Sequence, residues 1–258
     1  MTRTISMVTL TAMIVLLAAS GVDARRKALK VIMNKDGVNL AARTITFKLN
    51  NAAEMTELKI FNLDGDLLEE KIEMHDGAPA GTELKINWPK LIDDPDNFVI
   101  ELKMHDVDEF WAGMSICRFH GTIPHEEVVF ESGKWEIRPK EAPKLDKVIP
   151  DIIEMLERFK ACSENDRALY VAGFTDTVGS RADNRELSRK RARAIAQYII
   201  NNGLKQRKIS VYVRGFGEEV LAVETGDSVD EEKNRRADYI ISNFHPQMSG
   251  PGSWVKIK

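Results

Sequence analysis

The chain has 258 residues, of which 43% are hydrophobic and 30% are charged, and its formal net charge is -3. This composition is typical of a soluble folded protein. The slightly acidic balance argues against a protein that binds nucleic acid over its whole surface. The length is sufficient for two domains of ordinary size.

The N-terminal residues have the features of a secretory signal peptide. Arg3 supplies a positive charge, an apolar run extends from Met7 to Ala19, and Val22 to Ala24 offers small residues where signal peptidase cuts. The apolar run is shorter than the roughly 20 residues that a transmembrane helix needs. We therefore predict that residues 1–24 are a cleaved signal and that the exported chain has no transmembrane segment. An uncleaved membrane anchor is the alternative.

Residues 25–119 have the pattern of a β-domain. Apolar and polar residues alternate along Ile45–Leu49, Leu84–Trp88 and Phe98–Met104, as in strands with one buried face. Asp64-Gly65 lies between two apolar runs and predicts a hairpin turn. We therefore predict a small antiparallel β-sandwich with an immunoglobulin-like fold. A membrane barrel is an alternative that we reject, because the segment is short for eight strands and its charged turns are too frequent.

Residues 120–245 alternate between strand and helix patterns. Residues 139–161 carry apolar residues at helical spacing, and a second helix is expected from about Asn184 to Gly203, where glycine suits the left-handed position after a helix. The order of elements predicts an α/β sandwich with helices packed on one sheet, so the whole chain is α+β with two domains. The expected strands are residues 126–132, 168–174, 209–215 and 238–242. Residues 246–258 are expected to be a flexible tail.

The chain contains two cysteines, Cys117 and Cys162, which are too few for a disulfide framework. In an exported protein they could form one bridge, which would join the segment before the second domain to its first helix. Two buried free thiols are the alternative. The sequence does not decide between them, because it does not provide the Cα separation that a disulfide requires.

Two residues of opposite charge stand where a strand-loop-helix unit brings them together. Asp176 follows a strongly apolar strand. Arg191 interrupts the apolar face of the second helix, four residues after Leu187 and four before Ile195. One interpretation is a buried salt bridge that fixes the unit. The other is a clamp for a zwitterion, in which the carboxylate accepts from an ammonium group, the guanidinium donates to a carboxylate and Asn184 adds an amide contact.

These residues lie within a longer motif. Gly173 to Ala192 reads G-F-T-D-x-x-G-S-x-x-x-N-x-x-L-S-x-x-R-A, which closely resembles the signature of the OmpA-like C-terminal domains. That family includes peptidoglycan-associated lipoprotein and MotB. Gly215–Glu218 and Asn234–Arg236 are similar to its later G-x-G-E and N-R-R elements, and Phe130–Asp146 is similar to its opening strand and helix start. The resemblance covers about Ile123 to Phe244.

The resemblance implies non-covalent binding of peptidoglycan through the meso-diaminopimelate of its stem peptide. In the family, the motif aspartate and the R-A arginine hold the zwitterionic end, and the motif asparagine and the first arginine of N-R-R also line the site. These positions correspond here to Asp176, Arg191, Asn184 and Arg235. The resemblance further implies a periplasmic location, at the peptidoglycan or outer membrane of a Gram-negative-type envelope.

Three positions depart from the family pattern. Phe174 replaces a common histidine, which we expect to change packing only. Leu221 stands where proline is usual, so that loop is expected to differ. Glu131 to Gly133 replaces a run that usually contains aspartate, which leaves any ligand contact there open.

Other functions fit the sequence less well. The five histidines show no metal-ligand spacing and neither cysteine has a catalytic context, so we expect no enzyme, metal site or cofactor. The basic runs within 185–193 and 233–236 alternate with acids or lie on a solvated helix face, so we expect no nucleic-acid binding. A further possibility is that residues 25–119 contact another envelope protein and the second domain only anchors them.

Overall fold

The computed structural model describes residues 13–15, 28–34, 36–89, 92–131, 133–160, 162, 166–250 and 252–258. The chain forms two compact units, Met1–Arg118 and Phe119–Lys258. The predicted signal lies almost entirely outside the described residues, since only Met13–Val15 of it is described, as strand β1. None of the helices within the described ranges is long and apolar enough to cross a membrane.

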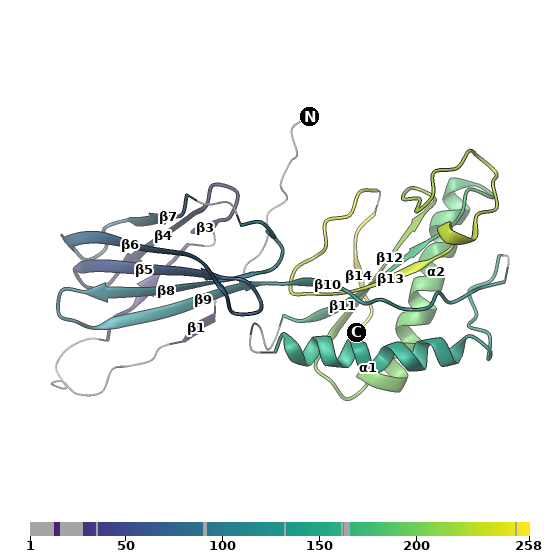
Figure 1. The fold of residues 1–258 in the computed structure, drawn as a ribbon, viewed down its shortest axis with the longest axis horizontal. Helices are drawn as coiled ribbons and strands as arrows, with labels where there is room; N and C mark the ends of the chain where they lie inside the picture. The colour runs from purple at the N-terminus through teal and green to yellow at the C-terminus, as the bar shows by residue number, and fades with distance from the viewer. Residues whose placement is uncertain are drawn as a thin grey trace. The chain divides into compact units, whose positions relative to one another are not determined.

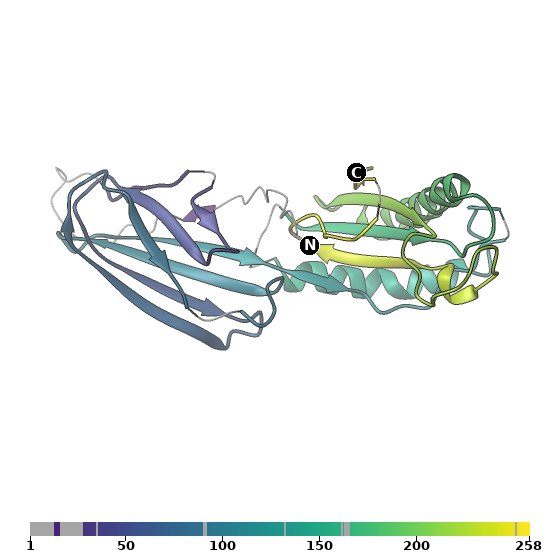
Figure 2. The ribbon, with the colours of Figure 1, turned by 90° about the horizontal axis from the view of Figure 1, so that it is seen from above.

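The strands of the N-terminal unit form two antiparallel arrangements (Figure 2). A five-stranded sheet has the order β1-β9-β8-β5-β6. Its strands after β1 are β5 (Ala53–Phe61), β6 (Leu67–Ala78), β8 (Phe98–Asp106) and β9 (Trp111–Arg118). In the other arrangement the strand β4 (Thr44–Leu49) pairs with three short strands. These three are β2 (Val31–Ile32), β3 (Val38–Asn39) and β7 (Leu84–Asn87).

The alternation predicted for this unit is confirmed by its core. Ile45, Phe47 and Leu49 of β4 and Ile100 and Leu102 of β8 are at most 2% exposed and belong to one apolar cluster. Burying a side chain of this size stabilises the fold by about 1.5–3 kcal/mol. The immunoglobulin-like assignment of the unit stays a prediction.

The turn predicted at Asp64-Gly65 connects β5 to β6. Gly65 has a φ of +90°, a value that residues with a side chain rarely adopt. The Asn62 side chain accepts hydrogen bonds from the backbone amides of Asp64 and Asp66, at 3.0 and 2.8 Å. The hairpin prediction is confirmed, and these local contacts explain why a short motif was sufficient to find it.

The middle of the edge strand β6 exposes apolar side chains to solvent. Ile72 is 56% exposed and Met74 is 51% exposed. Lys71 and Glu73 alternate with them and lie on the opposite side of the strand, where Lys71 donates a hydrogen bond of 2.7 Å to Asn87 of β7. Period-two alternation alone would have assigned the apolar side to the core.

The C-terminal unit contains one mixed sheet in the order β10-β13-β11-β12-β14. The strands β11 and β12 are parallel, and the other neighbours are antiparallel. Two helices, α1 (Ala142–Arg158) and α2 (Arg181–Ile199), cover one face of this sheet (Figure 1). The strands are β10 (His120–Thr122), β11 (Ala168–Phe174), β12 (Ser210–Gly217), β13 (Ala237–Ser242) and β14 (Val255–Lys256).

The strand predicted at residues 126–132 is wrong, because its described part has no regular secondary structure. The first strand of the sheet is β10 instead, which pairs with β13. Val128 is buried, as a strand pattern would suggest. However, the amide of the next residue, Val129, donates to the Glu141 side chain at 3.0 Å rather than to a neighbouring strand. A side chain thus accepts the backbone hydrogen bond that a neighbouring strand would accept in a sheet.

The segment expected to be a flexible tail contributes an edge strand. Within it, β14 pairs antiparallel with β12. The Trp254 ring lies 5.0 Å from the Tyr170 ring, measured between centroids, and Met248 joins the same cluster. Successive side chains of a strand alternate between faces, and Gly173 faces α2, so Tyr170 lies on the face away from the helices. The Gly and Pro residues of this segment are typical of a flexible tail, so the sequence alone did not reveal that Trp254 packs on Tyr170.

The helix predicted near Asn184 begins three residues earlier and ends differently. Ser180 caps α2 by accepting a hydrogen bond from the Asp183 amide at 3.1 Å. The helix continues into a wider π-helical turn, Ile200–Leu204. Gly203 lies inside this turn and has no left-handed φ, so the predicted helix-ending role is wrong. A Cβ there would meet Ile149 of α1 at 2.5 Å, which makes close helix packing the reason for glycine.

The two cysteines can now be assigned. Cys117 and Cys162 are both disulfide-bonded, and the described residues include no free thiol. The alternative of two buried thiols is therefore wrong. Disulfides persist in oxidising compartments, so this finding is consistent with the predicted export.

Close packing of α2 on the sheet provides a first testable prediction. A Cβ on Gly215 of β12 would meet the Arg189 amide nitrogen and would lie 2.6 Å from the Arg185 carbonyl oxygen. We expect Gly215→Ala to push α2 outward and to lower the free energy of unfolding by about 1–3 kcal/mol. Urea unfolding measures this. The control is Gly226→Ala, where the added Cβ meets no atom within 4 Å, and equal stability of both variants would contradict the prediction.

Candidate functional site

Asp176 lies in the loop that follows β11. The strand is buried along its whole length, and the chain then turns at Gly179, whose φ is +102°. Asp176 itself is only 7% exposed. One carboxylate oxygen, Oδ2, accepts a hydrogen bond from Nη1 of Arg235 at 2.6 Å, and Oδ1 accepts one from the Val178 amide at 3.3 Å. A nearly buried carboxylate is thus paired with a guanidinium from a distant part of the chain.

Arg235 joins two carboxylates. Its Nη1 donates to Asp176 and also to Asp230. The hydrogen bond to Asp176 is the main cause that raises the pKa of Arg235, the interactions with Asp230 raise it further, and burial opposes them. The positive charge of Arg235 is therefore largely compensated within the protein.

Asn184, on the first turn of α2, connects the Asp176 loop to the end of β12. It is 4% exposed. Its Nδ2 donates to Oε2 of Glu218 at 2.6 Å and to the backbone carbonyl oxygen of Asp176 at 3.3 Å. Both amide protons are thus used inside the protein. This arrangement fixes the position of the Asp176 backbone relative to α2.

Arg191 is buried, and its hydrogen bonds go to backbone carbonyl groups. The residue is 5% exposed. Nε donates to the Lys134 carbonyl oxygen at 2.9 Å and Nη2 donates to that of Glu131 at 3.2 Å. The guanidinium carbon lies 5.1 Å from the centre of the Phe130 ring. The direct Asp176–Arg191 salt bridge is therefore the wrong interpretation, since Asp176 pairs with Arg235 instead.

The charge of Arg191 is compensated by dipoles and by a nearby carboxylate. Burial lowers the pKa of Arg191 below its ordinary value, the negative charge of Asp176 opposes this, and the positive charge of Arg235 adds to it. Arginine nevertheless stays protonated in proteins, because its pKa is far above neutral. A buried cation held by neutral carbonyl groups keeps its full charge and favours an anionic ligand.

Glu141 holds the segment that supplies those carbonyl groups. Its side chain is buried and accepts from the Val129 amide at 3.0 Å, from Arg138 at 3.0 Å and from Lys144 at 2.8 Å. Arg138 also donates to the Val129 carbonyl oxygen at 2.9 Å. Burial acts to raise the pKa of Glu141, but the hydrogen bonds from Lys144 and Val129 and the charges of Lys144 and Arg138 outweigh it and lower the pKa.

Asn234, the first residue of the N-R-R element, has a structural role. Its side chain is fully buried. The side-chain oxygen accepts from the amides of Ala222 and Val223, at 2.8 and 2.9 Å, and Nδ2 donates to the Val223 carbonyl oxygen at 2.9 Å. These three bonds shape the long loop after β12 and thereby place Arg235.

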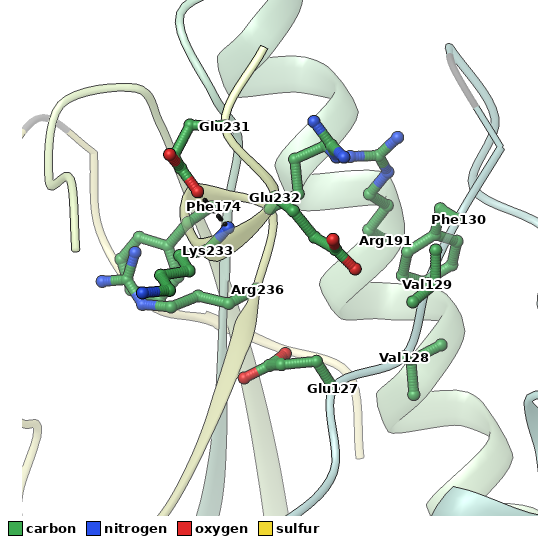
Figure 3. Close-up of a pocket in the computed structure, with 11 residues that line it drawn as sticks. Glu127, Val128, Val129, Phe130, Phe174, Arg191, Glu231, Glu232, Lys233 and Arg236 are labelled. Carbon is green, nitrogen blue, oxygen red and sulfur yellow. Dashed lines mark hydrogen bonds between the residues drawn. The ribbon is translucent and has the colours of Figure 1, made fainter. Parts of the chain in front are cut away.

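A pocket of about 390 Å³ opens beside Arg191 (Figure 3). Of the four residues predicted for the site, Arg191 and Arg235 line this pocket, whereas Asp176 and Asn184 do not. Sequence reasoning missed five charged residues of its walls. These are Glu127, Glu231, Glu232, Lys233 and Arg236. The density of charge in residues 231–236 was a signal for four of them, but a solvated loop gives the same pattern.

Residues 129–235 match the model of the OmpA family. That range contains Asp176, Asn184, Arg191 and Arg235, so the resemblance inferred from the motif is confirmed for this part of the chain.

The similarity to curated relatives is confined to part of each protein. Outer membrane protein A from Citrobacter freundii is 34% identical over 111 residues, which cover 43% of this chain and 42% of that protein. The homologous protein from Klebsiella pneumoniae is 32% identical over 111 residues, covering 43% and 29%. The chain thus spans less than half the length of these curated relatives.

Two solved structures are also similar to the domain. The peptidoglycan-associated lipoprotein from Burkholderia pseudomallei is 20% identical with a TM-score of 0.35, covering 45% of this chain and 90% of that one. The C-terminal domain of Helicobacter pylori MotB is 16% identical with a TM-score of 0.34, covering 46% and 84%.

Two of the three departures from the OmpA-family pattern have local explanations. Phe174 is buried, stacks on Phe216 with ring centroids 5.1 Å apart, and lies 3.8 Å from the Arg236 guanidinium carbon. The replacement of histidine thus serves packing, as expected. At Glu131 it is the backbone carbonyl, rather than the side chain, that contacts Arg191. That contact does not require aspartate.

The lowered pKa of Glu141 leads to a pH-dependent prediction. Its charged form stabilises the fold above its unfolded-state pKa of about 4.3, and this contribution is lost as the pH falls from there through the lower folded-state value. We expect Glu141→Gln to lose about 1–3 kcal/mol at neutral pH and to decline less on acidification. Urea unfolding across a pH series measures both effects.

The control for this experiment is Glu154→Gln, an exposed glutamate on the same helix. The free energy of unfolding of this variant should decline on acidification as that of the parent protein does. Parallel stability curves for Glu141→Gln and the parent would show that the carboxylate does not contribute.

Proposed function

We propose that the C-terminal domain, residues 120–245, binds peptidoglycan non-covalently through the meso-diaminopimelate of the stem peptide. The observation that carries the proposal is Arg191, a buried guanidinium that lines a pocket and whose protein partners are neutral carbonyl groups. The match of residues 129–235 to the OmpA family supports the same ligand, which the family resemblance implies.

The chemistry of the pocket suits a free amino-acid end. A guanidinium donates parallel hydrogen bonds to a carboxylate, and the bonds that Arg191 makes to carbonyl groups leave further N–H groups for such a ligand. Asp176 and Arg235 act as a fixed pair beside it, and Asn184 holds the backbone of their loop. In this proposal Asp176, Asn184 and Arg235 are also site residues. Asp176 acts by positioning Arg235, and Asn184 acts by positioning the backbone of the Asp176 loop.

The expected affinity is modest for one site and larger on the polymer. Hydrogen bonds to charged groups contribute about 1.5–3 kcal/mol each. Two or three of them correspond to roughly millimolar to micromolar binding. Because the cell wall presents many copies of the stem peptide, rebinding raises retention without further contacts. We therefore propose an exchangeable anchor that holds the protein at the wall without cleaving it.

The location and the N-terminal unit belong to the same proposal. A chain that is exported after cleavage of residues 1–24 would lie in the periplasm, at the peptidoglycan or outer membrane. A second candidate function is that of an adaptor whose β-domain, residues 25–119, binds another envelope protein. The exposure of Ile72 and Met74 on β6 favours it, since apolar residues side by side on an exposed strand suit a protein contact.

Co-sedimentation with purified cell wall tests the anchor. We expect Arg191→Ala and Asp176→Ala to abolish binding to diaminopimelate-type wall, because one removes the carboxylate-binding group and the other releases Arg235. The parent protein should bind much more weakly to wall that contains lysine in place of diaminopimelate, since lysine lacks the distal carboxylate. Retention of both variants at the parental level would contradict the proposal.

The matched control is Arg193→Ala, which removes an exposed arginine from the same helix. It should bind like the parent. Circular dichroism must show that each variant is folded, and Arg191→Lys provides a second test if Arg191→Ala is unstable. Lysine keeps the charge but not the planar donor group, so we expect binding at least about tenfold weaker. A zymogram that clears purified wall would overturn the expectation of binding without catalysis.

A further inference from the structure

The strand β6 has one unpaired edge in the described part of the chain. It lies at the end of the five-stranded sheet, and β5 is the only strand of the described residues that pairs with it (Figure 1). Residues 69–74 of β6 pair with β5 in unbroken register, so the opposite edge of this stretch is regular. An unpaired edge presents backbone N–H and C=O groups in the geometry that a further strand needs.

The two sides of this stretch differ in chemistry. Ile72 and Met74 are exposed on the solvent side. Lys71 lies on the core side, because its register partner on β5 is the buried Leu58, and it forms an ion pair of 2.7 Å with Glu73. Charged side chains on the core side of an edge strand discourage pairing with unrelated strands. A partner strand must therefore offer complementary charges on one side and apolar side chains on the other.

A second copy of β6 meets both requirements in one register. When two copies pair antiparallel about a two-fold axis perpendicular to the sheet, each residue lies opposite a residue on the same side of the strand. With Ile72 opposite its own copy, Lys71 of each chain lies opposite Glu73 of the other, and Met74 is diagonal to Ile72. Centring the pair on Lys71 or on Glu73 instead would bring like charges together, which is destabilising. The charge pattern thus favours one register.

We propose that the protein forms a two-fold symmetric dimer in which β6 pairs antiparallel with β6 of a second copy, with Ile72 at the axis. Backbone hydrogen bonds continue the sheet across the two copies, and the pairs of Lys71 with Glu73 set the register. The side chains of Ile72 and Met74 from both copies meet on the solvent side. This dimer does not depend on wall binding. If the C-terminal domain binds the wall as proposed, the dimer carries two such domains and is retained more strongly.

Analytical ultracentrifugation of the full chain over a concentration series tests for the dimer. We expect a monomer–dimer equilibrium whose Kd rises at least about tenfold in Lys71→Glu, because both cross-strand pairs then bring like charges together. The double variant Lys71→Glu/Glu73→Lys should restore the dimer, since the reversed pairs are complementary again. The control Lys85→Glu reverses an exposed charge on β7 and should dimerise like the parent. Circular dichroism must show that each variant is folded.

Cysteine cross-linking tests the register. The chain has two cysteines and both are disulfide-bonded, so one added cysteine supplies the only free thiol. Ile72→Cys places two thiols across the axis, and we expect a covalent dimer after mild oxidation. In Glu70→Cys the two thiols are four positions out of register, about 14 Å apart along the strands, which is too far for a disulfide.

The opposite results would overturn the dimer. A protein that stays monomeric at every concentration would show that β6 does not bind a second copy. Dimerisation that Lys71→Glu leaves unchanged, or equal cross-linking of Ile72→Cys and Glu70→Cys, would show that the copies do not meet in this register. The co-sedimentation of Arg191 and Asp176 variants with cell wall is a separate measurement, so failure of the dimer and failure of the proposed function are distinguishable.

Discussion

The hydrogen bonds from Arg191 to two backbone carbonyl groups are the interaction on which the candidate site depends. A buried arginine needs hydrogen-bond acceptors, and a carboxylate would have satisfied it while cancelling its charge. The carbonyl groups of Glu131 and Lys134 satisfy part of the guanidinium and leave the charge in place. The remaining donors face a pocket whose walls carry both signs of charge. This is how a charge can lie on the apolar face of a helix while no carboxylate of the described residues is in direct contact with it.

Two sets of contacts keep this arrangement in register. Glu141 holds the irregular segment before α1, so the carbonyl groups stay at a fixed distance from α2. Ser188 of α2 accepts a hydrogen bond from the Gly217 amide at 2.9 Å, which fixes the helix against the end of β12. Gly173 and Gly215 leave room for the helix backbone at the same level. Because both sides of Arg191 are fixed, its side chain needs little reorganisation to bind an anion.

The pairing of Asp176 with Arg235 gives the site a second, separate charge system. In the zwitterion clamp read from the motif, Asp176 and Arg191 act directly on the two ends of the ligand. The structure instead pairs Asp176 with Arg235 and holds that pair within the protein. Arg191 donates to the carbonyl groups of Lys134 and Glu131, and no carboxylate of the described residues is in contact with it. A ligand could supply that carboxylate.

The sequence by itself determined the features that depend on local spacing. Alternation found the buried faces of β4 and β8, Asp64-Gly65 located the hairpin, and the motif around Asp176 identified the OmpA-family domain. The tertiary structure decided the partners, because these join residues that are far apart in the chain. Asp176 and Arg235 are 59 positions apart, and Lys134 and Arg191 are 57 apart. The packing of Trp254 on Tyr170 and the irregular course of residues 126–131 have the same origin, since side chains from distant elements satisfy them. Local periodicity specifies which face of an element is apolar, whereas only the folded chain specifies which groups that face meets.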